Sequence, residues 1–399
     1  MKMRVCILTT SFPRYKGDLS GNFVYELARN LVKKGVEVNV VAPHDYETKS
    51  YEVMDGIEIH RFQYMFPKRL QRLAYHGGIP SNIRRSFIAK LELPLFMLSF
   101  FTMGFRICRK CDVIHAQWAF SGLVGTLLKK IYRKHVVLTV HGSDINNIPQ
   151  KGLLKKLSVY TFKNVDQIIA VSNALKNRIS DFGISTNKIK VIPNAVNIID
   201  FPVGFKDTND FKILFVGRLV PEKGLKYLIE AMKEVIKEIP RATLTIVGDG
   251  PLRKELEKLV EELSIQDKIR FEGMKTHSEI PKYMQGADLF VLPSLSEGLP
   301  LVLLEAMAVG KPVVTTKVGG ILDVVIDGET GVIVPPRDSK ALIIAITYLL
   351  ENDEKRMKMS ENARRCIEEK FTWKRISEKT FQLYKPLIAN IRVYHERFL

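Results

Sequence analysis

The sequence predicts an α/β protein of two Rossmann-like domains whose parallel sheets face each other across a cleft. Short β-branched runs alternate with amphipathic helical stretches along the chain, a pattern typical of parallel sheets covered by helices on both faces. The chain has 399 residues, which is too long for one ordinary core. Because the alternation runs through two successive series, we expect two domains of this kind.

The first series predicts six strands and the helices between them. The strand runs are RVCILTT, VEVNVVAP, DVIHAQ, HVVLTV, QIIAVS and IKVIP. The stretch GNFVYELARNLVKKG is a helical pattern that places Phe23, Leu27, Leu31 and Val32 on one face. Gly35 is a residue type that commonly ends a helix.

The second series repeats this scheme with the strand runs FKILFVG, ATLTIVGDG, KIRFEG, DLFVLP, KPVVTT and GVIVPP. Between the two series lies a segment with two prolines and little periodicity, so we expect a linker near residues 195–209. The predicted organisation is one domain over residues 1–195, a second over 210–370, and C-terminal helices over 371–399 that pack back on the first domain.

Composition indicates a soluble globular protein, with 46% hydrophobic and 26% charged residues. The apolar run near the N-terminus is only a few residues long, shorter than a signal peptide requires, so we expect a cytoplasmic protein. Cys108 and Cys111 lie close together, but a zinc site needs four ligands and the sequence has no second pair. Clustered acidic motifs for a divalent ion are also absent from the sequence, so we expect neither a metal nor another cofactor.

Residues 61–110 carry much of the positive charge. The chain has a net charge of +18, and this block holds ten basic residues and the single acid Glu92. It also contains the apolar run LPLFMLSFFTMGF over residues 93–105, which is too short to span a bilayer and is interrupted near its start by Pro94. Basic residues beside an apolar run favour a segment that lies on an anionic membrane surface. The alternative is a buried helix with solvated basic flanks.

In open parallel sheets ligands bind outside the carboxyl ends of the strands, so the loops after the strands are the candidate sites. The loop FVGRLVPEKGL places Arg218 and Lys223 before a helical pattern, where they form a candidate anion site next to Gly217. Two solvated surface cations are the alternative. Gly248 follows the next strand, where it allows a tight turn and close backbone approach.

The stretch SEGLPLVLLEAMAVGKP contains two carboxylates in an apolar setting, Glu297 and Glu305. The pattern predicts a strand ending at Pro293, a loop over residues 294–298, and a helix from about Pro300 to Val309. The free N–H groups at the N-terminus of this helix suit a diphosphate. The two acids could contact a sugar at one end of the diphosphate and a nucleoside at the other. The alternative is an amphipathic helix whose acids face solvent.

The first half offers polar groups in equivalent positions. Gly21 and Asn22 stand at a helix start after the first strand, and His115 lies in the run DVIHAQ. His141 and Asp144 follow the strand HVVLTV. A histidine just past a strand end can donate to a substrate or act as a general acid or base, although a lone histidine is more often structural.

Together these residues resemble the retaining glycosyltransferases of family 4, which have the two-domain GT-B fold. The resemblance covers most of the chain and is most specific over residues 211–336. The motifs that carry it are the Glu-x7-Glu pair Glu297 and Glu305, the VGRL…EKG loop Val216 to Gly224, the HG turn His141–Gly142, and the glycine loop LSGNFV.

The resemblance implies a role for each motif. Arg218 and Lys223 hold the donor diphosphate, Glu297 contacts the transferred sugar, Glu305 binds the ribose hydroxyls, and His141 contacts the sugar near the reacting centre. The wider set of implied donor contacts is Gly21, Asn22, Gly217, Arg218, Lys223, Gly248, Gly298, Leu299, Leu301 and Glu305. For the acceptor or sugar we expect contacts from His115 and Asp144.

The expected reaction is metal-independent transfer from a UDP- or GDP-sugar to a hydroxyl acceptor, with retained anomeric configuration. The acceptor would be a lipid-linked or cell-surface glycan precursor, bound by the N-terminal domain at the cytoplasmic membrane face. A sugar-nucleotide epimerase or hydrolase on the same fold is the main alternative. The charge of +18 also suggests nucleic acid, but no recognition helix or aromatic-basic RNA motif accompanies it. The last alternative is a non-catalytic protein that binds a membrane surface. It would not explain the charged motif residues Arg218, Lys223, Glu297 and Glu305.

Overall fold

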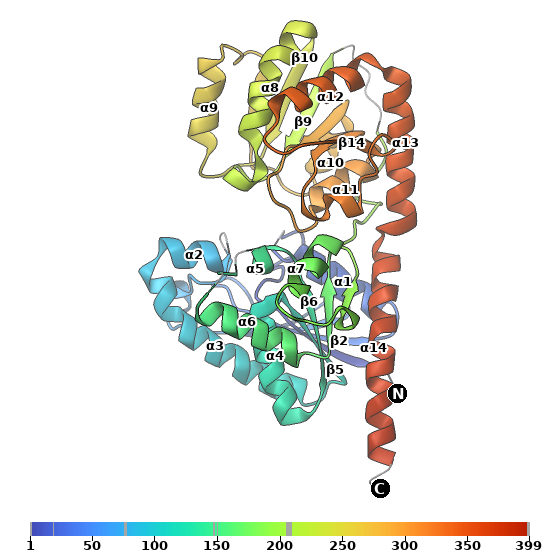
Figure 1. The fold of residues 1–399 in the computed structure, drawn as a ribbon. Helices are drawn as coiled ribbons and strands as arrows, with labels where there is room; N and C mark the ends of the chain where they lie inside the picture. The colour runs from blue at the N-terminus through green and yellow to red at the C-terminus, as the bar shows by residue number, and fades with distance from the viewer. Residues whose placement is uncertain are drawn as a thin grey trace. The chain divides into compact units, whose positions relative to one another are not determined.

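The computed structural model describes residues 2–18, 20–75, 78–146, 148–149, 151–204 and 210–396. The chain divides into two compact units (Figure 1): unit 1 comprises Met1–Pro193 with Trp373–Leu399, and unit 2 comprises Asn194–Thr372. The linker predicted at 195–209 falls at the start of unit 2, and its residues 205–209 lie outside the described part of the chain.

Unit 1 contains an eight-stranded sheet in the order β3-β4-β2-β1-β5-β6-β7-β8. Neighbouring strands run parallel throughout, except that β3 is antiparallel to β4. The strands are β1 (Arg4–Leu8), β2 (Glu37–Pro43), β3 (Tyr51–Met54), β4 (Ile57–Phe62), β5 (Val113–Gln117), β6 (His135–Val140), β7 (Gln167–Ala170) and β8 (Ile189–Val191).

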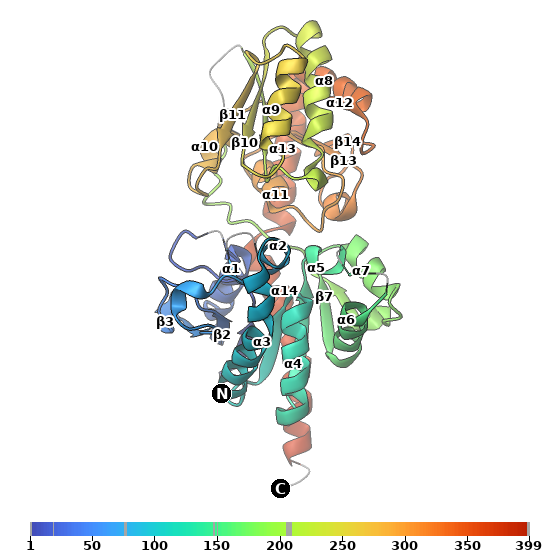
Figure 2. The same cartoon turned by 90° about the vertical axis from the view of Figure 1, so that its left-hand side faces the viewer.

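Helices cover both faces of this sheet. On one face α3, α4 and α6 lie side by side (Figure 2), and on the other α1 packs against α14. The helices are α1 (Asn22–Val32), α2 (Ile79–Arg85), α3 (Phe87–Cys108), α4 (Trp118–Tyr132), α5 (Ser143–Asn146), α6 (Leu153–Asn164), α7 (Asn173–Ser180) and α14 (Trp373–Glu396), with 3₁₀ turns at Lys68–Leu70 and Thr186–Lys188.

Unit 2 contains a six-stranded, fully parallel sheet in the order β11-β10-β9-β12-β13-β14. Its strands are β9 (Phe211–Val216), β10 (Ala242–Val247), β11 (Ile269–Gly273), β12 (Leu289–Leu292), β13 (Val313–Thr316) and β14 (Gly331–Val334). Its helices are α8 (Leu225–Glu238), α9 (Arg253–Glu262), α10 (Ile280–Gln285), α11 (Leu301–Ala308), α12 (Ser339–Glu351) and α13 (Asp353–Lys370), with 3₁₀ turns at Pro221–Lys223 and Gly319–Asp323.

The strand orders confirm the predicted fold class of two Rossmann-like units with parallel sheets. In each sheet the chain order reverses at one point, between β1 and β5 in unit 1 and between β9 and β12 in unit 2. The loops after these strand pairs diverge to opposite faces, which opens a crevice at the carboxyl edge where ligands bind in such folds. The candidate loops of the sequence follow these four strands or their neighbours.

The hairpin formed by β3 and β4 is absent from the predicted strand set. Its turn is Asp55–Gly56, both with positive φ (48° and 80°), as a two-residue hairpin turn requires. The Asp-Gly pair between the alternating runs YEVM and IEIHRF is the signal that could have revealed it. The helical face predicted for residues 21–35 is confirmed at Leu27 and Leu31, which are buried, and wrong at Phe23 and Val32, which are not among the buried residues of α1. The buried side of α1 includes Val24, Ala28 and Leu31, whereas Phe23 turns away from this core.

Helix α3 is longer than the apolar run predicted at 93–105, and Pro94 lies inside it rather than interrupting it. Among the described helices it is the one that length and apolar composition would allow to cross a membrane. One stripe, which includes Phe96, Phe100 and Cys108, is buried against the sheet and α4. The remainder of the helix is largely exposed, with 28% of its most apolar window buried.

Helix α14 belongs to unit 1, although it follows unit 2 in the sequence. It packs against α1 and contacts β5. Lys34 forms an ion pair with Glu378, and the side chain of Tyr384 is fully buried beneath the helix. This single helix takes the place of the helices predicted over 371–399.

Candidate functional site

Two loops at the point of strand reversal carry three of the charged residues predicted for the site, Arg218, Lys223 and Glu297. Gly217 and Arg218 follow β9, and Lys223 ends a 3₁₀ turn before α8. Glu297 lies in the loop between β12 and α11. Because β9 and β12 are neighbours in the sheet, the two loops start side by side.

Glu297 is held by two donors. Lys223 Nζ donates to its Oε1 at 2.6 Å, and Ser294 Oγ donates to the same oxygen at 2.6 Å. Ser294 is itself fully buried, and its carbonyl accepts a hydrogen bond from the hydroxyl of Thr316 on β13. The carboxylate is therefore oriented, and its second oxygen is left for another partner. Sequence reasoning did not identify Ser294, although a hydroxyl directly after a strand end was its available signal.

Arg218 contrasts with Lys223. Its side chain is exposed, and no hydrogen-bond or ion-pair partner for it is found in the described part of the chain. A guanidinium that has no carboxylate partner can grip an anion with two parallel hydrogen bonds. The two loops carry Arg218 and Lys223 against Glu222 and Glu297, and Arg218 is the cation whose side chain has no hydrogen-bond or ion-pair partner among the described residues.

Gly319 keeps the Glu297 loop close to the next turn of the chain. A Cβ on Gly319 would lie 1.9 Å from the carbonyl oxygen of Glu297, and its φ is +51°. Only glycine fits this approach without displacing the loop. Sequence reasoning did not identify this contact, because it joins backbones that are distant in sequence.

Helix α11 starts at Leu301 with Pro300 as its N-cap, one residue from the predicted start. Glu305 lies inside the helix, half-buried, with Oε1 3.3 Å from Nε2 of His277. His277 precedes α10 and was not predicted. Of the remaining expected donor contacts, Leu299 is 6% exposed and belongs to the core, whereas Gly298 and Leu301 stay partly exposed.

The glycine turn of unit 1 follows β1. Gly21 is the N-cap of α1 with φ +65°, and a Cβ there would lie 2.3 Å from the carbonyl oxygen of Ser11. Asn22 is the first helical residue and is half-buried. The turn therefore brings the start of α1 against the end of the strand loop.

His141 follows β6 and sits between two aromatic rings. Its ring centre lies 4.5 Å from that of Phe23 and 5.1 Å from that of Trp118. Nε2 lies 2.9 Å from Oε1 of Gln117, and Nδ1 is buried with no hydrogen-bond partner among the described residues. Burial, followed by the nearby His115, lowers the pKa of His141 to about 3, so the imidazole is neutral at pH 7.

His115 is fully buried and has no direct access to an acceptor, contrary to the expected contact. Its Nε2 lies 2.7 Å from the hydroxyl of Thr139 and 3.2 Å from the amide nitrogen of Gln117. Its Nδ1 lies 2.5 Å from the hydroxyl of Tyr384 on α14. Burial lowers its pKa to about 3. His115 therefore links the C-terminal helix to His141 through Gln117, a chain that sequence reasoning missed.

Asp144 accepts hydrogen bonds from backbone amides of two neighbouring loops. One carboxylate oxygen accepts from the backbone amides of His141 and Gly142, both at 3.1 Å, and the other accepts from the amide of Ala119 at 3.0 Å. Burial raises the pKa of Asp144, and these backbone hydrogen bonds oppose the shift. The residue joins the loops after β5 and β6, and its expected contact with acceptor or sugar stays a prediction.

The described residues contain no group of three or more His, Cys, Asp or Glu side chains that could hold a metal ion. Cys108 and Cys111 are both buried free thiols. The loops of unit 2 offer cations, carboxylates and a hydroxyl, which can bind a diphosphate and sugar hydroxyls, and the loops of unit 1 separately offer a neutral imidazole.

Family models match both halves of the chain. The model described as Glycosyltransferase Family 4 matches residues 20–199, and the model described as Glycosyl transferases group 1 matches residues 197–366. An uncharacterized glycosyltransferase of Methanocaldococcus jannaschii is 30% identical over 368 residues, which cover 90% of this chain and 93% of the relative. The chain belongs to the group 1 glycosyltransferases. It is an enzyme that transfers sugars.

Other proteins resemble this glycosyltransferase along most of its length. A second uncharacterized glycosyltransferase of M. jannaschii is 29% identical over 405 residues, which cover 96% of this chain and 98% of the relative. A phosphatidylinositol N-acetylglucosaminyltransferase component of Arabidopsis thaliana is 27% identical over 418 residues, which cover 100% of this chain and 85% of the relative.

Solved structures confirm the GT-B fold of this glycosyltransferase. Sucrose-phosphate synthase from Thermosynechococcus elongatus superposes with a TM-score of 0.80 at 24% identity, covering 98% of this chain and all of that one. HepE from Anabaena, solved in complex with UDP, gives a TM-score of 0.76 at 22% identity, covering 96% of this chain and all of that one.

Proposed function

We propose that this glycosyltransferase moves a sugar from a UDP- or GDP-sugar to a hydroxyl acceptor, with retention and without a metal. The observation that carries the proposal is the arrangement of Lys223, Ser294 and Glu297 at the strand reversal, beside the free cation Arg218. HepE, which shares the fold, was solved in complex with UDP. Retention follows from the family resemblance of the Glu297–Glu305 motif.

The charge of the leaving group explains the cations. As the bond between the anomeric carbon and the diphosphate oxygen breaks, negative charge grows on the diphosphate and the sugar becomes oxocarbenium-like. Arg218 and Lys223 stabilise that charge, aided by the N–H groups at the start of α11. The acceptor oxygen then bonds to the anomeric carbon from the same face, and its proton passes to the departing phosphate oxygen.

Glu297 orients the transferred sugar rather than attacking it. Its Oε1 already accepts from Lys223 and Ser294, which leaves the other oxygen for a sugar hydroxyl. This role differs from glycosidases, in which two carboxyl groups flank the bond. We assign Glu305 to the ribose hydroxyls and the neutral imidazole of His141 to the sugar.

A double variant tests the diphosphate site. Arg218→Ala with Lys223→Ala should raise the dissociation constant of UDP or GDP at least tenfold and reduce transfer, while the melting temperature without ligand changes little. Lys226→Ala with Lys237→Ala is the matched control, since these exposed lysines lie on α8. Transfer near the wild-type rate in the Arg218 and Lys223 variant would reject the assignment.

The anomeric outcome is tested separately. An α-linked donor should give an α-linked product when the first product is followed by NMR before it equilibrates. A β-linked first product would reject retention while leaving the transferase activity intact. The epimerase or hydrolase alternative is disfavoured because the matched families and the long relatives are described as glycosyltransferases.

We also propose that the acceptor is a lipid or lipid-linked glycan and that the enzyme works on the cytoplasmic membrane surface. The outer side of α3 exposes large apolar side chains, namely Phe87, Ile88, Leu91, Leu95, Leu98 and Phe105. Exposed cations flank them at Arg84, Lys90, Arg106, Arg109 and Lys110. A basic rim around an apolar surface suits an anionic bilayer. The name of the Arabidopsis relative includes phosphatidylinositol, a lipid.

Two residues of the basic block do not belong to this surface. Arg61 is 1% exposed, pairs with Glu52 at 2.7 Å and donates to the carbonyl of Pro13 at 2.7 Å. Glu92 is fully buried, where one of its oxygens accepts from the amides of Arg72 and Leu73. Glu92, the acid of the block, is therefore withdrawn from the surface that the exposed cations share.

Vesicle flotation tests the membrane proposal. Leu91→Asp with Leu98→Asp should abolish flotation with anionic vesicles at moderate salt. Ile199→Asp with Ile344→Asp, exposed apolar positions of unit 2, is the matched control and should float normally. Equal flotation of both double variants would contradict a role for α3.

A further inference from the structure

Unit 1 has a basic pocket at the edge of its sheet that is opposite to the loops described above. Strands β6 and β7 begin at this edge, with His135 and Gln167, whereas His141 lies past the other end of β6. Six residues of strand span about 20 Å, so the pocket is separate from the His141 cluster. Its volume is about 840 Å³, which lies within the range of small-molecule sites.

The pocket is strongly cationic. Its walls come from the C-terminal ends of α4 and α6, from the starts of β6 and β7, and from the 3₁₀ turn that precedes β8. Asp166 is the single carboxylate among the residues that line it. The lining cations are Lys129, Lys130, Arg133, Lys134, Lys163 and Lys188.

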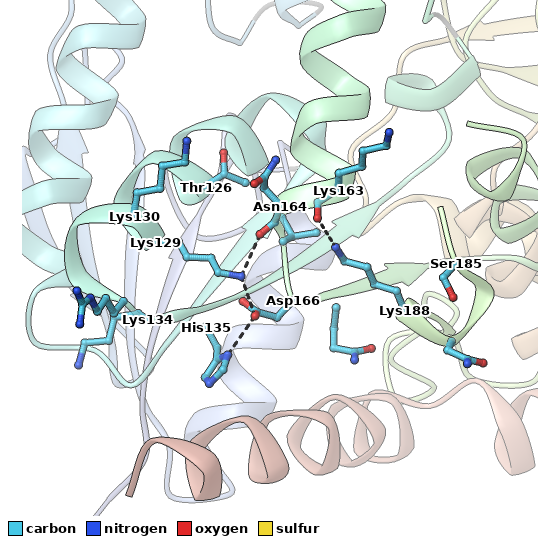
Figure 3. A pocket seen from close by; sticks show the side chains of 14 residues that line it. Thr126, Lys129, Lys130, Lys134, His135, Lys163, Asn164, Asp166, Ser185 and Lys188 are labelled. Carbon is cyan, nitrogen blue, oxygen red and sulfur yellow. Dashed lines mark hydrogen bonds and ion pairs between the residues drawn. The ribbon is translucent and has the colours of Figure 1, made fainter. Parts of the chain in front are cut away.

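Two lysines, Lys129 and Lys188, extend into the pocket from opposite sides (Figure 3). Lys129 Nζ donates to the carbonyl of Asn164 at 3.0 Å and pairs with Asp166 at 2.7 Å. Lys188 Nζ donates to the carbonyl of Lys163 at 2.7 Å. These carbonyls end α6, so the two ammonium groups also cap that helix.

The capping of α6 explains only part of the positive charge in the pocket. Asp166 is already shared by Lys129 and by His135, whose Nδ1 lies 3.2 Å from it. Lys188 forms no ion pair with a carboxylate in the described part of the chain, and burial and then Lys129 lower its pKa, an effect that the charge of Asp166 partly opposes. A bound anion would relieve this repulsion.

The rim adds further cations. Arg133, Lys134 and Lys163 form no ion pair with any described residue, whereas Lys130 lies over the ring of Tyr160, 5.2 Å from its centre. Arg133 has φ +54° at the C-cap of α4, a conformation that favours glycine. A large cation therefore occupies a position where glycine would fit with less strain.

We propose that this pocket binds an anion that carries phosphate groups. Several cations around one recess, with amide and hydroxyl groups of Asn187 and Ser185 at its rim, match the charge and the acceptor oxygens of phosphate. The source is either a soluble polyphosphate or the headgroup of an anionic lipid. The proposal does not depend on which donor or acceptor the enzyme uses.

Pyrophosphate calorimetry at low salt tests the pocket. The parent protein carries Arg218→Ala and Lys223→Ala, so that the proposed donor site does not contribute. Adding Arg133→Gly and Lys163→Gln should weaken pyrophosphate binding at least tenfold. Arg133→Gly suits the left-handed backbone, which keeps the fold intact, and the melting temperature verifies this.

The matched control removes the same number of charges elsewhere. Lys33→Gln with Lys358→Gln, both exposed, should leave the affinity of the same parent protein within about twofold, because the pocket cations remain. If the parent does not bind pyrophosphate, or if the pocket and control variants lose the same affinity, the proposal is overturned.

Vesicle flotation distinguishes a lipid headgroup from a soluble polyphosphate. The pocket variant and its parent have the same α3 surface, so a difference between them reports on the pocket. Vesicles of phosphatidylcholine with about 20 mol% phosphatidic acid are compared with vesicles of equal charge made with phosphatidylglycerol. Weaker flotation of the pocket variant with phosphatidic acid identifies a lipid phosphate headgroup. Unchanged flotation together with weaker pyrophosphate binding identifies a soluble phosphate ligand.

Discussion

Replacing Gly319 with alanine should displace Glu297 and reduce sugar transfer more than it reduces stability. The new Cβ would lie 1.9 Å from the carbonyl oxygen of Glu297, whereas real Cβ atoms essentially never come within 3.0 Å of another atom. One backbone segment must therefore move by at least about 1.1 Å, because packed interiors do not absorb such overlap. The Glu297–Lys223 contact of 2.6 Å lies on the displaced loop.

A displacement of this size should reduce transfer about 100-fold, since a misplacement of about 1 Å in a group that orients the substrate can cost that much. Gly328→Ala is the matched control. Gly328 also has positive φ (+74°), but nothing lies within 4 Å of the added Cβ. Both alanines should cost about 1 kcal/mol of unfolding free energy for the left-handed backbone, and the clash adds to this cost for Gly319 alone.

The assay combines donor turnover with urea unfolding of both variants. We expect Gly328→Ala to keep near wild-type turnover and Gly319→Ala to lose it while still folding. If both variants keep full turnover, the contact does not position Glu297. If both lose turnover equally, backbone strain rather than displacement is responsible.

Three further outcomes follow from the contacts. Because burial lowers the pKa of His115 and His141 to about 3, the unfolded chain takes up protons below pH 6.5 that the folded protein does not. The unfolding free energy should be undiminished above pH 6.5 and fall by about 2 kcal/mol per histidine at pH 5 in urea titrations; an unchanged value would show that both are protonated when folded. Tyr384→Phe removes the partner of His115 Nδ1 and should cost about 1–3 kcal/mol of unfolding free energy, which a wild-type urea midpoint would contradict. His277→Ala removes the contact to Glu305 and should weaken nucleoside diphosphate binding severalfold in calorimetry, whereas equal affinity would separate His277 from the site.

The sequence alone determined the fold class and the positions of the two loops that form the candidate site in unit 2. Strand and helix periods are local properties of the chain, so the run before Gly217 and the helix that contains Glu305 could be placed from pattern alone. Parallel strands bring their carboxyl ends to one edge, which is why Arg218, Lys223 and Glu297 could be grouped before any contact was known. The hairpin at Asp55–Gly56 was not predicted, although its Asp-Gly turn is a local signal of the same kind.

Only the tertiary structure decided which side chain contacts which. His115 and Asp144 have the residue types of a site, yet one is buried against Tyr384 and the other joins backbone amides of neighbouring loops. Ser294 and Gly319 carry no motif, yet they hold and confine Glu297. These roles depend on contacts between segments far apart in the sequence, and such contacts exist only after the sheets and helices have packed.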